Sequence, residues 1–559
     1  MAPSGTAVVD PWTRLGLLGG LLAAGVVFVH VPVIVWAGNV AEFHAPLTHL
    51  LLFSLAALLT AMLMCLTILR LLPPAARAGL ACLLCAIGLS WWGYGTQFVG
   101  RMAVLDGQGA PMDFQTALGA WELPLAAAGV LLLAFGIGRK RGLATFAVLT
   151  LNVGLFVATT VTVVSSRSVG RQASGVPPDE AIFRFSPASN VLVILLDGLQ
   201  ADVAARVLAE PALEGAFEGF QFYRDTLAAA PTTFLSLPAI HSGAIYEPGQ
   251  IVRDYFTDAI EHRSFMTRFA AAGYDTALVN PIEGLCPDGI TACTAAATIL
   301  RPRSEQARLE ALRLLDLSLF RVSPVRLKRH IYDDANWFVS RQMAVVDHWA
   351  DQILQGNRLI EEMGERLAFN DGAPTLKFLH SMSTHTPYIL ADDCQTVVDT
   401  TLERLPAQTR CALLAVSTLL DRMKQARIYD EAVILVLADH GINSGVYPAA
   451  RPGSHNAWRY LAGGANPVFL LKRRGASGAL QEAPGAVSLA DVGATLCAAS
   501  AACAMPLGTP AGQAPADRLR RFNEYVWREE FWRLRDLPDV TPHEVRGPLW
   551  KRGSWRSPD

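Results

Sequence analysis

Five apolar stretches in the first third of this 559-residue chain constrain its fold more than any other feature of the sequence. Each is about as long as the twenty or so residues that a helix needs to cross a bilayer. They contribute to a hydrophobic content of 52%, which is high for a soluble protein. We therefore predict an N-terminal transmembrane domain of five helices over residues 1–166. The stretches are roughly Leu15–Ala37, Leu47–Leu72, Ala75–Tyr94, Trp121–Gly138 and Leu143–Val164.

The basic residues around these stretches predict the orientation of the chain. Arg14 precedes the first stretch, and Arg70 and Arg77 lie between the second and third. A basic cluster at 139–141 lies between the fourth and fifth, whereas the other two connections carry only Arg101. Because basic residues are enriched in cytoplasmic loops, we expect the N-terminus inside and everything after about residue 166 outside. Four further apolar stretches after the first argue against a cleaved signal peptide.

The nine cysteines agree with this topology. Three lie within the apolar stretches, where small apolar packing residues are expected rather than a metal or redox site. The other six form three pairs close in sequence, which suggests local disulfides in an oxidising compartment. These pairs are Cys286/Cys293, Cys394/Cys411 and Cys497/Cys503.

The remainder of the chain is expected to be an exported α/β domain. A tether rich in Ser, Gly and Pro covers residues 167–187, the domain runs over 188–514, and a segment at 515–559 is expected to pack on it. Short apolar runs alternate with helix-length segments, which indicates βαβ units and a mostly parallel sheet. Strands are predicted at Val191–Leu196, Thr276–Val279, Leu376–Leu379, Ala432–Leu437 and Pro467–Leu471, and helices at 305–321, 338–366, 401–427 and 488–499.

Two segments of the exported part allow more than one interpretation. Residues 301–329 alternate basic side chains with a leucine-rich face. They could form an ordinary helix with a solvated face, which we favour, or a basic amphipathic helix lying on anionic headgroups. The segment 515–559 interleaves Trp with Arg, but a nucleic-acid partner is not expected for an exported domain.

Residues that bind metals or phosphate follow several of the predicted strands. Asp197 ends the apolar run 190–196, at the sheet edge where ligands of open α/β folds bind. Asp439 and His440 follow another strand, and Asp–His pairs suit a divalent ion such as Zn²⁺ or Mn²⁺. Residues 230–243 place a hydroxyl before a helix start, where the helix dipole favours an oxyanion or a bound phosphate.

Two further segments complete the pattern. His380-Ser-Met-Ser-Thr-His-Thr-Pro-Tyr388 follows the strand that ends near Leu379, and Gly453-Ser-His455 comes a short loop after His440. Any one of these residues could be structural. Four segments at successive strand ends instead indicate an active site.

In their order along the chain, these segments resemble the alkaline phosphatase superfamily, in its sulfatase-like branch. Five spans before such a domain are similar to the phosphoethanolamine transferases that modify lipid A and to the lipoteichoic acid synthases, which transfer phosphoglycerol. Thr233-Phe-Leu-Ser-Leu-Pro238 resembles the Thr-x-x-Ser-x-Pro element of the former. The resemblance implies that Thr233, rather than Thr232, is the nucleophile.

The same resemblance implies the other site residues. It makes Asp197, Thr233, Asp439 and His440 ligands of one divalent metal, and His385 and His455 ligands of the phosphate or of a second ion. His330 and Trp337 have a spacing that resembles a substrate-pocket pair of the synthases.

The sequence also departs from these families. The transferases and synthases have Glu at the position of Asp197, whereas sulfatases and nucleotide pyrophosphatases have Asp there. A true sulfatase is disfavoured, because the Cys/Ser-x-Pro/Ala-x-Arg motif is missing.

The expected function is transfer of phosphoethanolamine or phosphoglycerol from a membrane phospholipid to an envelope lipid or glycan, through a phospho-threonine. The alternatives are a hydrolase of the same fold, with water as the acceptor, and a non-catalytic lipid-binding envelope protein. The expected location is the bacterial cytoplasmic membrane, with the catalytic domain facing the periplasm or exterior.

Overall fold

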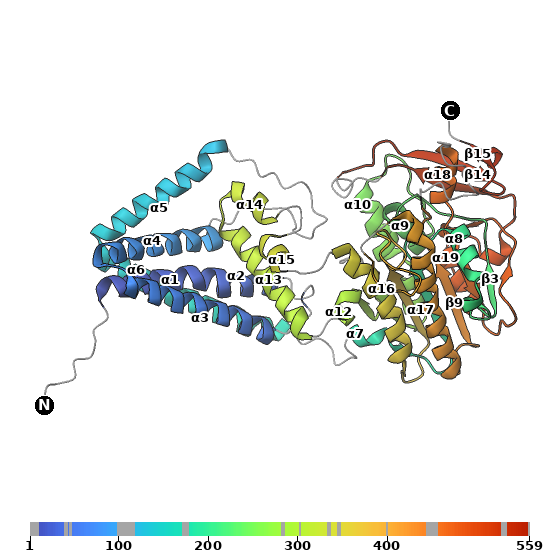
Figure 1. The fold of residues 1–559 in the computed structure, drawn as a ribbon, viewed down its shortest axis with the longest axis horizontal. Coiled ribbons are helices and arrows are strands. Elements are labelled where there is room, and N and C mark those ends of the chain that lie inside the picture. Colours follow the sequence, from blue (N-terminus) through green and yellow to red (C-terminus); the bar gives the residue numbers. More distant parts are fainter. Residues whose placement is uncertain are drawn as a thin grey trace. The chain divides into compact units, whose positions relative to one another are not determined.

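The chain forms two compact units, described here each by itself. The first comprises residues 1–175 and 301–345, and the second comprises 176–300 and 346–559 (Figure 1). The structure is a computed structural model that describes residues 10–38, 43, 47–97, 118–169, 178–280, 286–300, 303–332, 337–343, 348–397, 401–442, 457–526 and 534–556.

The first unit contains the five predicted apolar helices, each long and apolar enough to cross a membrane. Side chains such as Leu59 and Phe156 are 69% and 73% exposed on them, as expected of a surface that faces lipid. The first span combines α1 (Pro11–Gly25), η1 (Val26–His30) and α2 (Val31–Gly38), and the others are α3 (Leu47–Leu71), α4 (Pro74–Trp92) with η3 (Gly93–Gln97), η4 (Gly119–Trp121) with α5 (Glu122–Arg139), and α6 (Arg141–Val169).

The basic segment also belongs to this first unit. It forms α13 (Arg303–Val322), α14 (Val325–Tyr332) and α15 (Phe338–Met343), and α13 packs on α2 and α3 (Figure 1). The division predicted from the sequence assigned this segment to the catalytic domain. Its leucine-rich face instead buries Leu314 beside Leu50, because packing on the spans removes this apolar surface from water.

The second unit is built on an eight-stranded sheet with the order β11-β3-β10-β9-β2-β8-β5-β6. The predicted mostly parallel sheet is confirmed, since β2 runs parallel to both β8 and β9, and only β10 is antiparallel to its neighbours. The strands are β2 (Asn190–Leu196), β3 (Phe220–Phe222), β5 (Asp275–Val279), β6 (Ala292–Thr294), β8 (Thr375–Ser381), β9 (Ala432–Leu437), β10 (Phe469–Lys472) and β11 (Gln481–Glu482).

The central strand β2 is buried on both faces, as its unbroken apolar run predicts. Val193 packs into one core cluster together with residues of α9 (Thr233–Ser242), α11 (Phe265–Ala271) and α19 (Val492–Ser500). Ile194 packs into another core cluster, with α8 (Ala201–Leu208), α16 (His348–Glu365) and α17 (Leu405–Gln425). The unit is therefore a sheet between two helical layers, with β2 in the middle.

Shorter elements complete the second unit. The three predicted disulfides are all formed. The short helices are α7 (Pro178–Ala181), α10 (Val252–Phe256), α12 (Ala296–Leu300) and α18 (Ala457–Gly464), and two parallel strand pairs join β1 (Arg184–Phe185) to β7 (Ala368–Phe369) and β4 (Thr226–Leu227) to β12 (Val487–Ser488).

The C-terminal segment forms an antiparallel sheet of β13 (Leu519–Glu524), β14 (Thr541–Arg546) and β15 (Trp555–Arg556). Arg520 joins this sheet to the rest of the unit. Its side chain is fully buried and donates to the Asp225 carboxylate at 2.9 Å and to the Asp225, Val487 and Gly547 carbonyl oxygens.

Replacing Arg520 with alanine should destabilise the second unit by about 3 kcal/mol, because the Asp225 carboxylate, which is only 14% exposed, loses its charged partner. Arg521→Ala is the matched control, since that arginine is half exposed and pairs with the exposed Glu247. The control should cost no more than about 1 kcal/mol. Urea unfolding followed by tryptophan fluorescence measures both changes, and equal shifts in the two midpoints would contradict the assignment.

Candidate metal centre

Asp197, Asp439 and His440 converge at the carboxyl edge of the central sheet. Asp197 follows β2 directly, and Asp439 lies two residues after the end of the neighbouring parallel strand β9, so the strand register places both acids at one edge. One ligand atom from each of the three residues lies within 4.8 Å of the other two. The side chains of both acids are at most 2% exposed.

The hydrogen bonds leave one oxygen of each carboxylate available for a cation. Asp439 Oδ1 accepts from the Gly198 and His440 backbone N–H groups, and Asp197 Oδ2 accepts from Thr233. The other two oxygens, Asp197 Oδ1 and Asp439 Oδ2, are buried and have no hydrogen-bond partner among the described residues. Buried acceptors without a donor are costly unless a cation meets them.

The spacing of these atoms also fits a metal ion. His440 Nε2 lies 3.6 Å from Asp197 Oδ1 and 3.5 Å from Asp439 Oδ2. Ligand atoms placed about 2.1 Å from a tetrahedral zinc ion lie about 3.4 Å from one another. Carboxylate oxygens and an imidazole nitrogen therefore form a fitting donor set for Zn²⁺ or Mn²⁺.

Thr233 meets this cluster from the start of α9. Its hydroxyl donates to Asp197 Oδ2 at 3.1 Å, and the residue as a whole is partly exposed. Thr232, the residue just before the helix, instead forms a short hydrogen bond with the Tyr525 hydroxyl of the C-terminal segment. The buried Ser236 hydroxyl donates to the Ala230 carbonyl and accepts from the Ala230 N–H, which closes the loop that presents Thr233.

His380 is a site residue to which the sequence analysis gave no role. It lies near the end of β8, the other parallel neighbour of β2, and its Nε2 is 3.0 Å from Asp197 Oδ2. The side chain is 1% exposed. The Thr384 hydroxyl donates a hydrogen bond to the backbone carbonyl of Asp197, which fixes the same residue. A histidine at the end of a strand beside the Asp197 strand was the signal that could have revealed it.

The surroundings keep the Asp197 carboxyl ionised. Burial raises its pKa, but the hydrogen bond from His380 and the charges of nearby imidazoles outweigh burial, so the pKa lies below its ordinary value. Burial lowers the pKa of His440, but the carboxylates of Asp439 and Asp197 raise it by more. Acids and imidazole thus stabilise one another in the absence of an ion.

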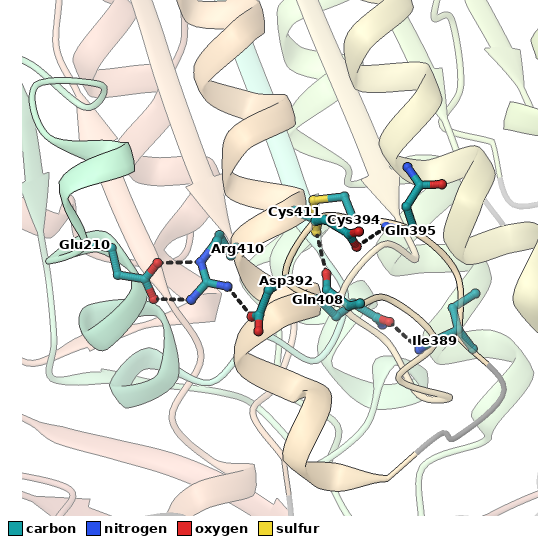
Figure 2. The surroundings of a disulfide bond; sticks show 10 residues. Glu210, Ile389, Asp392, Cys394, Gln395, Gln408, Arg410 and Cys411 are labelled. Carbon is teal, nitrogen blue, oxygen red and sulfur yellow. Dashed lines mark hydrogen bonds and ion pairs between the residues drawn. A yellow bond between two sulfur atoms is a disulfide. The ribbon is translucent and has the colours of Figure 1, made fainter.

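The loop that carries His385 is fastened to α17 (Figure 2). The Gln408 amide donates to the His385 carbonyl and accepts from the Ile389 N–H, each at 2.8 Å. Three residues further along α17, the Cys394–Cys411 disulfide ties down the end of the same loop. His385 is partly exposed, and a positive charge on its imidazole lowers the pKa of the Asp197 carboxyl.

Arg410 strengthens this attachment (Figure 2). Its guanidinium donates to both carboxylate oxygens of Glu210 and forms a short ion pair with Asp392 in the loop. The loop after His385 is therefore held to α17 by an amide, a disulfide and an ion pair.

Removing the disulfide as Cys394→Ser/Cys411→Ser should loosen the His385 loop. We expect amide hydrogen exchange across 385–397 to accelerate at least about tenfold, because a bridge over a loop of this length contributes about 3 kcal/mol. The matched control is Cys497→Ser/Cys503→Ser, which removes another local bridge and should leave exchange in 385–397 unchanged. Unchanged exchange in the first variant would show that the disulfide does not hold the loop.

Three predicted site residues remain, and none of them belongs to the described part of the second unit. His455 lies outside the described residues. His330 and Trp337 belong to the first unit, where His330 is exposed on α14. Trp337 is 1% exposed and packs against the rings of Phe320 and Tyr332. Their role as a substrate-pocket pair stays a prediction.

Comparison with known proteins gives only distant likenesses. No protein-family model and no curated protein matches the sequence. The chain is similar to a solved alkaline phosphatase superfamily protein of Vibrio parahaemolyticus, with 12% identity, a TM-score of 0.42, and coverage of 68% of this chain and 84% of that one. It is also similar to the PsFucS1 sulfatase of Pseudoalteromonas, with 12% identity, a TM-score of 0.38, and coverage of 66% of this chain and 82% of that one. A third similar structure is the lipoteichoic acid synthase LtaP of Listeria monocytogenes, with 13% identity, a TM-score of 0.37, and coverage of 65% of this chain and 86% of that one.

Proposed function

We propose that the chain is a membrane-anchored, metal-dependent transferase of phospholipid headgroups with Thr233 as its nucleophile. One observation carries the proposal: the Thr233 hydroxyl is hydrogen-bonded to Asp197 beside two bare carboxylate oxygens and an imidazole. A nucleophile, a cation site and a helix N-terminus that suits phosphate thus occur together. The five apolar helices of the same chain account for a lipid as donor.

The residues of the site have distinct roles in the proposed reaction. Asp197, Thr233, Asp439 and His440 would hold the divalent ion, Zn²⁺ or Mn²⁺, which would supply Lewis acidity that lowers the pKa of a bound hydroxyl and neutralises phosphate charge. His380 fixes Asp197 through its hydrogen bond. His385 and His455 would bind the phosphate oxygens.

The reaction proceeds in two displacements. Thr233 Oγ1 attacks the phosphorus, the bond between phosphorus and the diacylglycerol oxygen breaks, and diacylglycerol leaves with the proton that the threonine has lost. The hydroxyl of an envelope lipid or glycan then attacks the phospho-threonine, loses its proton to Thr233 and carries the headgroup away. Phosphoethanolamine and phosphoglycerol are the proposed headgroups.

The membrane anchor favours this chemistry. We place the N-terminus in the cytoplasm and the second unit outside, on the distribution of basic residues around the spans. Tethering then raises the effective concentration of lipid headgroups at the site.

The test uses the full chain in nanodiscs that contain phosphatidylethanolamine or phosphatidylglycerol labelled in the headgroup. We expect diacylglycerol as a product of one of the two lipids, lost on EDTA treatment and restored by Zn²⁺ or Mn²⁺. Label on a co-reconstituted acceptor lipid or glycan supports the transferase, whereas free headgroup phosphate alone supports the hydrolase with water as acceptor. No diacylglycerol from either lipid would refute both and favour the non-catalytic alternative.

A further inference from the structure

The helices α13 and α14 contact one end of the bundle of spans, and α15 packs on both of them. In this end of the first unit, α13 packs against α2 at the end of the first span and α3 at the start of the second (Figure 1). Arg321 of α13 donates from Nε to the carbonyl of Gly95, near the end of the third span, at 2.7 Å. The contacted ends all lie on the side where the fifth span ends, because consecutive spans alternate in direction.

A buried acid fixes α14 to the fourth span. Glu122, the first residue of α5, is 6% exposed, and its two carboxylate oxygens accept from the Val325 and Arg326 backbone N–H groups at 2.8 and 3.0 Å. A carboxylate at a helix N-terminus stabilises the helix through its free N–H groups and its dipole. α14 therefore keeps a defined position at the rim of the bundle, at the depth where the fourth span begins.

One face of α14 is basic and exposed. Arg326, Arg329 and His330 are exposed and lie three and four residues apart, so they share a side of the helix. Neither arginine has an ion-pair partner among the described residues. Lys328 points the other way, with Nζ donating to the Phe320 carbonyl at 2.6 Å.

The composition of the whole segment agrees with this charge. Between residues 301 and 345, basic residues outnumber acidic ones nine to five. On α14 itself, Leu327 is 39% exposed beside the arginines. Basic side chains next to an exposed leucine are typical of helices that lie in the interfacial region of a membrane.

We propose that this basic face of α14, made of Arg326, Arg329 and His330, binds the phosphate groups of anionic phospholipids at the membrane surface. The occupant is a lipid because the face is fixed at the rim of the spans, where headgroup phosphates lie, and because its charge complements theirs. Leu327 reaches into the boundary between headgroups and acyl chains. The inference stands on the first unit alone and is independent of the proposed chemistry.

The test measures lipid binding to the full chain in neutral detergent by native mass spectrometry. The probes are phosphatidylglycerol, phosphatidylcholine and inorganic phosphate. Arg326→Glu/Arg329→Glu is compared with Arg253→Glu/Arg268→Glu, which makes the same charge change at two exposed arginines of the second unit. Thermal unfolding verifies that both variants are folded.

We expect the α14 variant to bind phosphatidylglycerol at least about 25-fold more weakly than the wild type, since each cation near an anionic surface strengthens binding about fivefold and the variant removes two. The control variant should bind as the wild type does, and phosphatidylcholine should bind all three proteins alike. An intermediate loss in Arg326→Gln/Arg329→Gln would support the role of charge. Equal phosphatidylglycerol binding by the wild type and the α14 variant would overturn the proposal, as would inorganic phosphate that competes with the lipid at millimolar concentration.

Discussion

Replacing Thr233 with alanine should reduce diacylglycerol release from the donor lipid by about 10⁴-fold or more, because the reaction loses its nucleophile. Thr233 is partly exposed, and among the described residues its hydroxyl bonds to Asp197 alone. The second unit should therefore keep its fold. The rate of diacylglycerol release in nanodiscs measures the loss, and the unfolding midpoint, expected within about 1 kcal/mol of the wild type, shows that folding is intact.

Thr232→Ala is the matched control, since it removes the same group from the adjacent residue. The Thr232 hydroxyl bonds to Tyr525 and not to Asp197, so the variant should lose less than about tenfold in rate, the scale of one hydrogen bond. Comparable losses of rate in the two variants would mean that both hydroxyls support the structure at the start of α9 and that neither is the nucleophile. A larger loss at Thr232 would reverse the assignment.

Replacing Asp439 with asparagine should remove the bound metal from the purified protein. Its bare Oδ2 is one of the two buried carboxylate oxygens that face His440, and the amide would bring no charge. Outer-sphere changes alone weaken metal binding by about 10–100-fold, so the loss of a direct ligand should exceed about 100-fold. The metal content per chain, measured by inductively coupled plasma mass spectrometry, should fall close to zero, and the rate of diacylglycerol release should fall with it.

Asp421→Asn is the control for this change, because it makes the same substitution at an exposed acid of α17. It should leave metal content and activity as in the wild type. A variant Asp439→Asn that keeps its full metal content would exclude this cluster as the metal site. A variant that loses the metal yet keeps its activity would show that the reaction does not need a metal at this site.

Much of the fold could be predicted because its signals are local. The run 190–196 is apolar without interruption, so it forms a strand buried on both faces, and the acid that follows it falls at the sheet edge. The strand predicted at Ala432–Leu437 has the observed bounds, so Asp439 follows a strand as expected, and the structure brings it to Asp197. Parallel pairing of neighbouring strands is what converts two separate strand ends into one site.

The rest depends on contacts between distant parts of the sequence. The leucine-rich face of α13 indicates that this helix packs on an apolar surface. Its periodicity does not tell whether that surface belongs to the spans, as observed, or to the sheet domain. His380 has a role only because β8 pairs with β2 in a register that brings it to Asp197. Tyr525 reaches Thr232 across 293 residues, a contact that no local pattern indicates.

Peptide mass spectrometry of the protein, stopped with acid during turnover of its lipid donor, tests directly whether Thr233 is the nucleophile. We expect a peptide with phosphoethanolamine or phosphoglycerol on Thr233 in the wild type, and none in Thr233→Ala or after removal of the metal. Diacylglycerol release without any modification of Thr233, or modification of another residue that persists in Thr233→Ala, would contradict it.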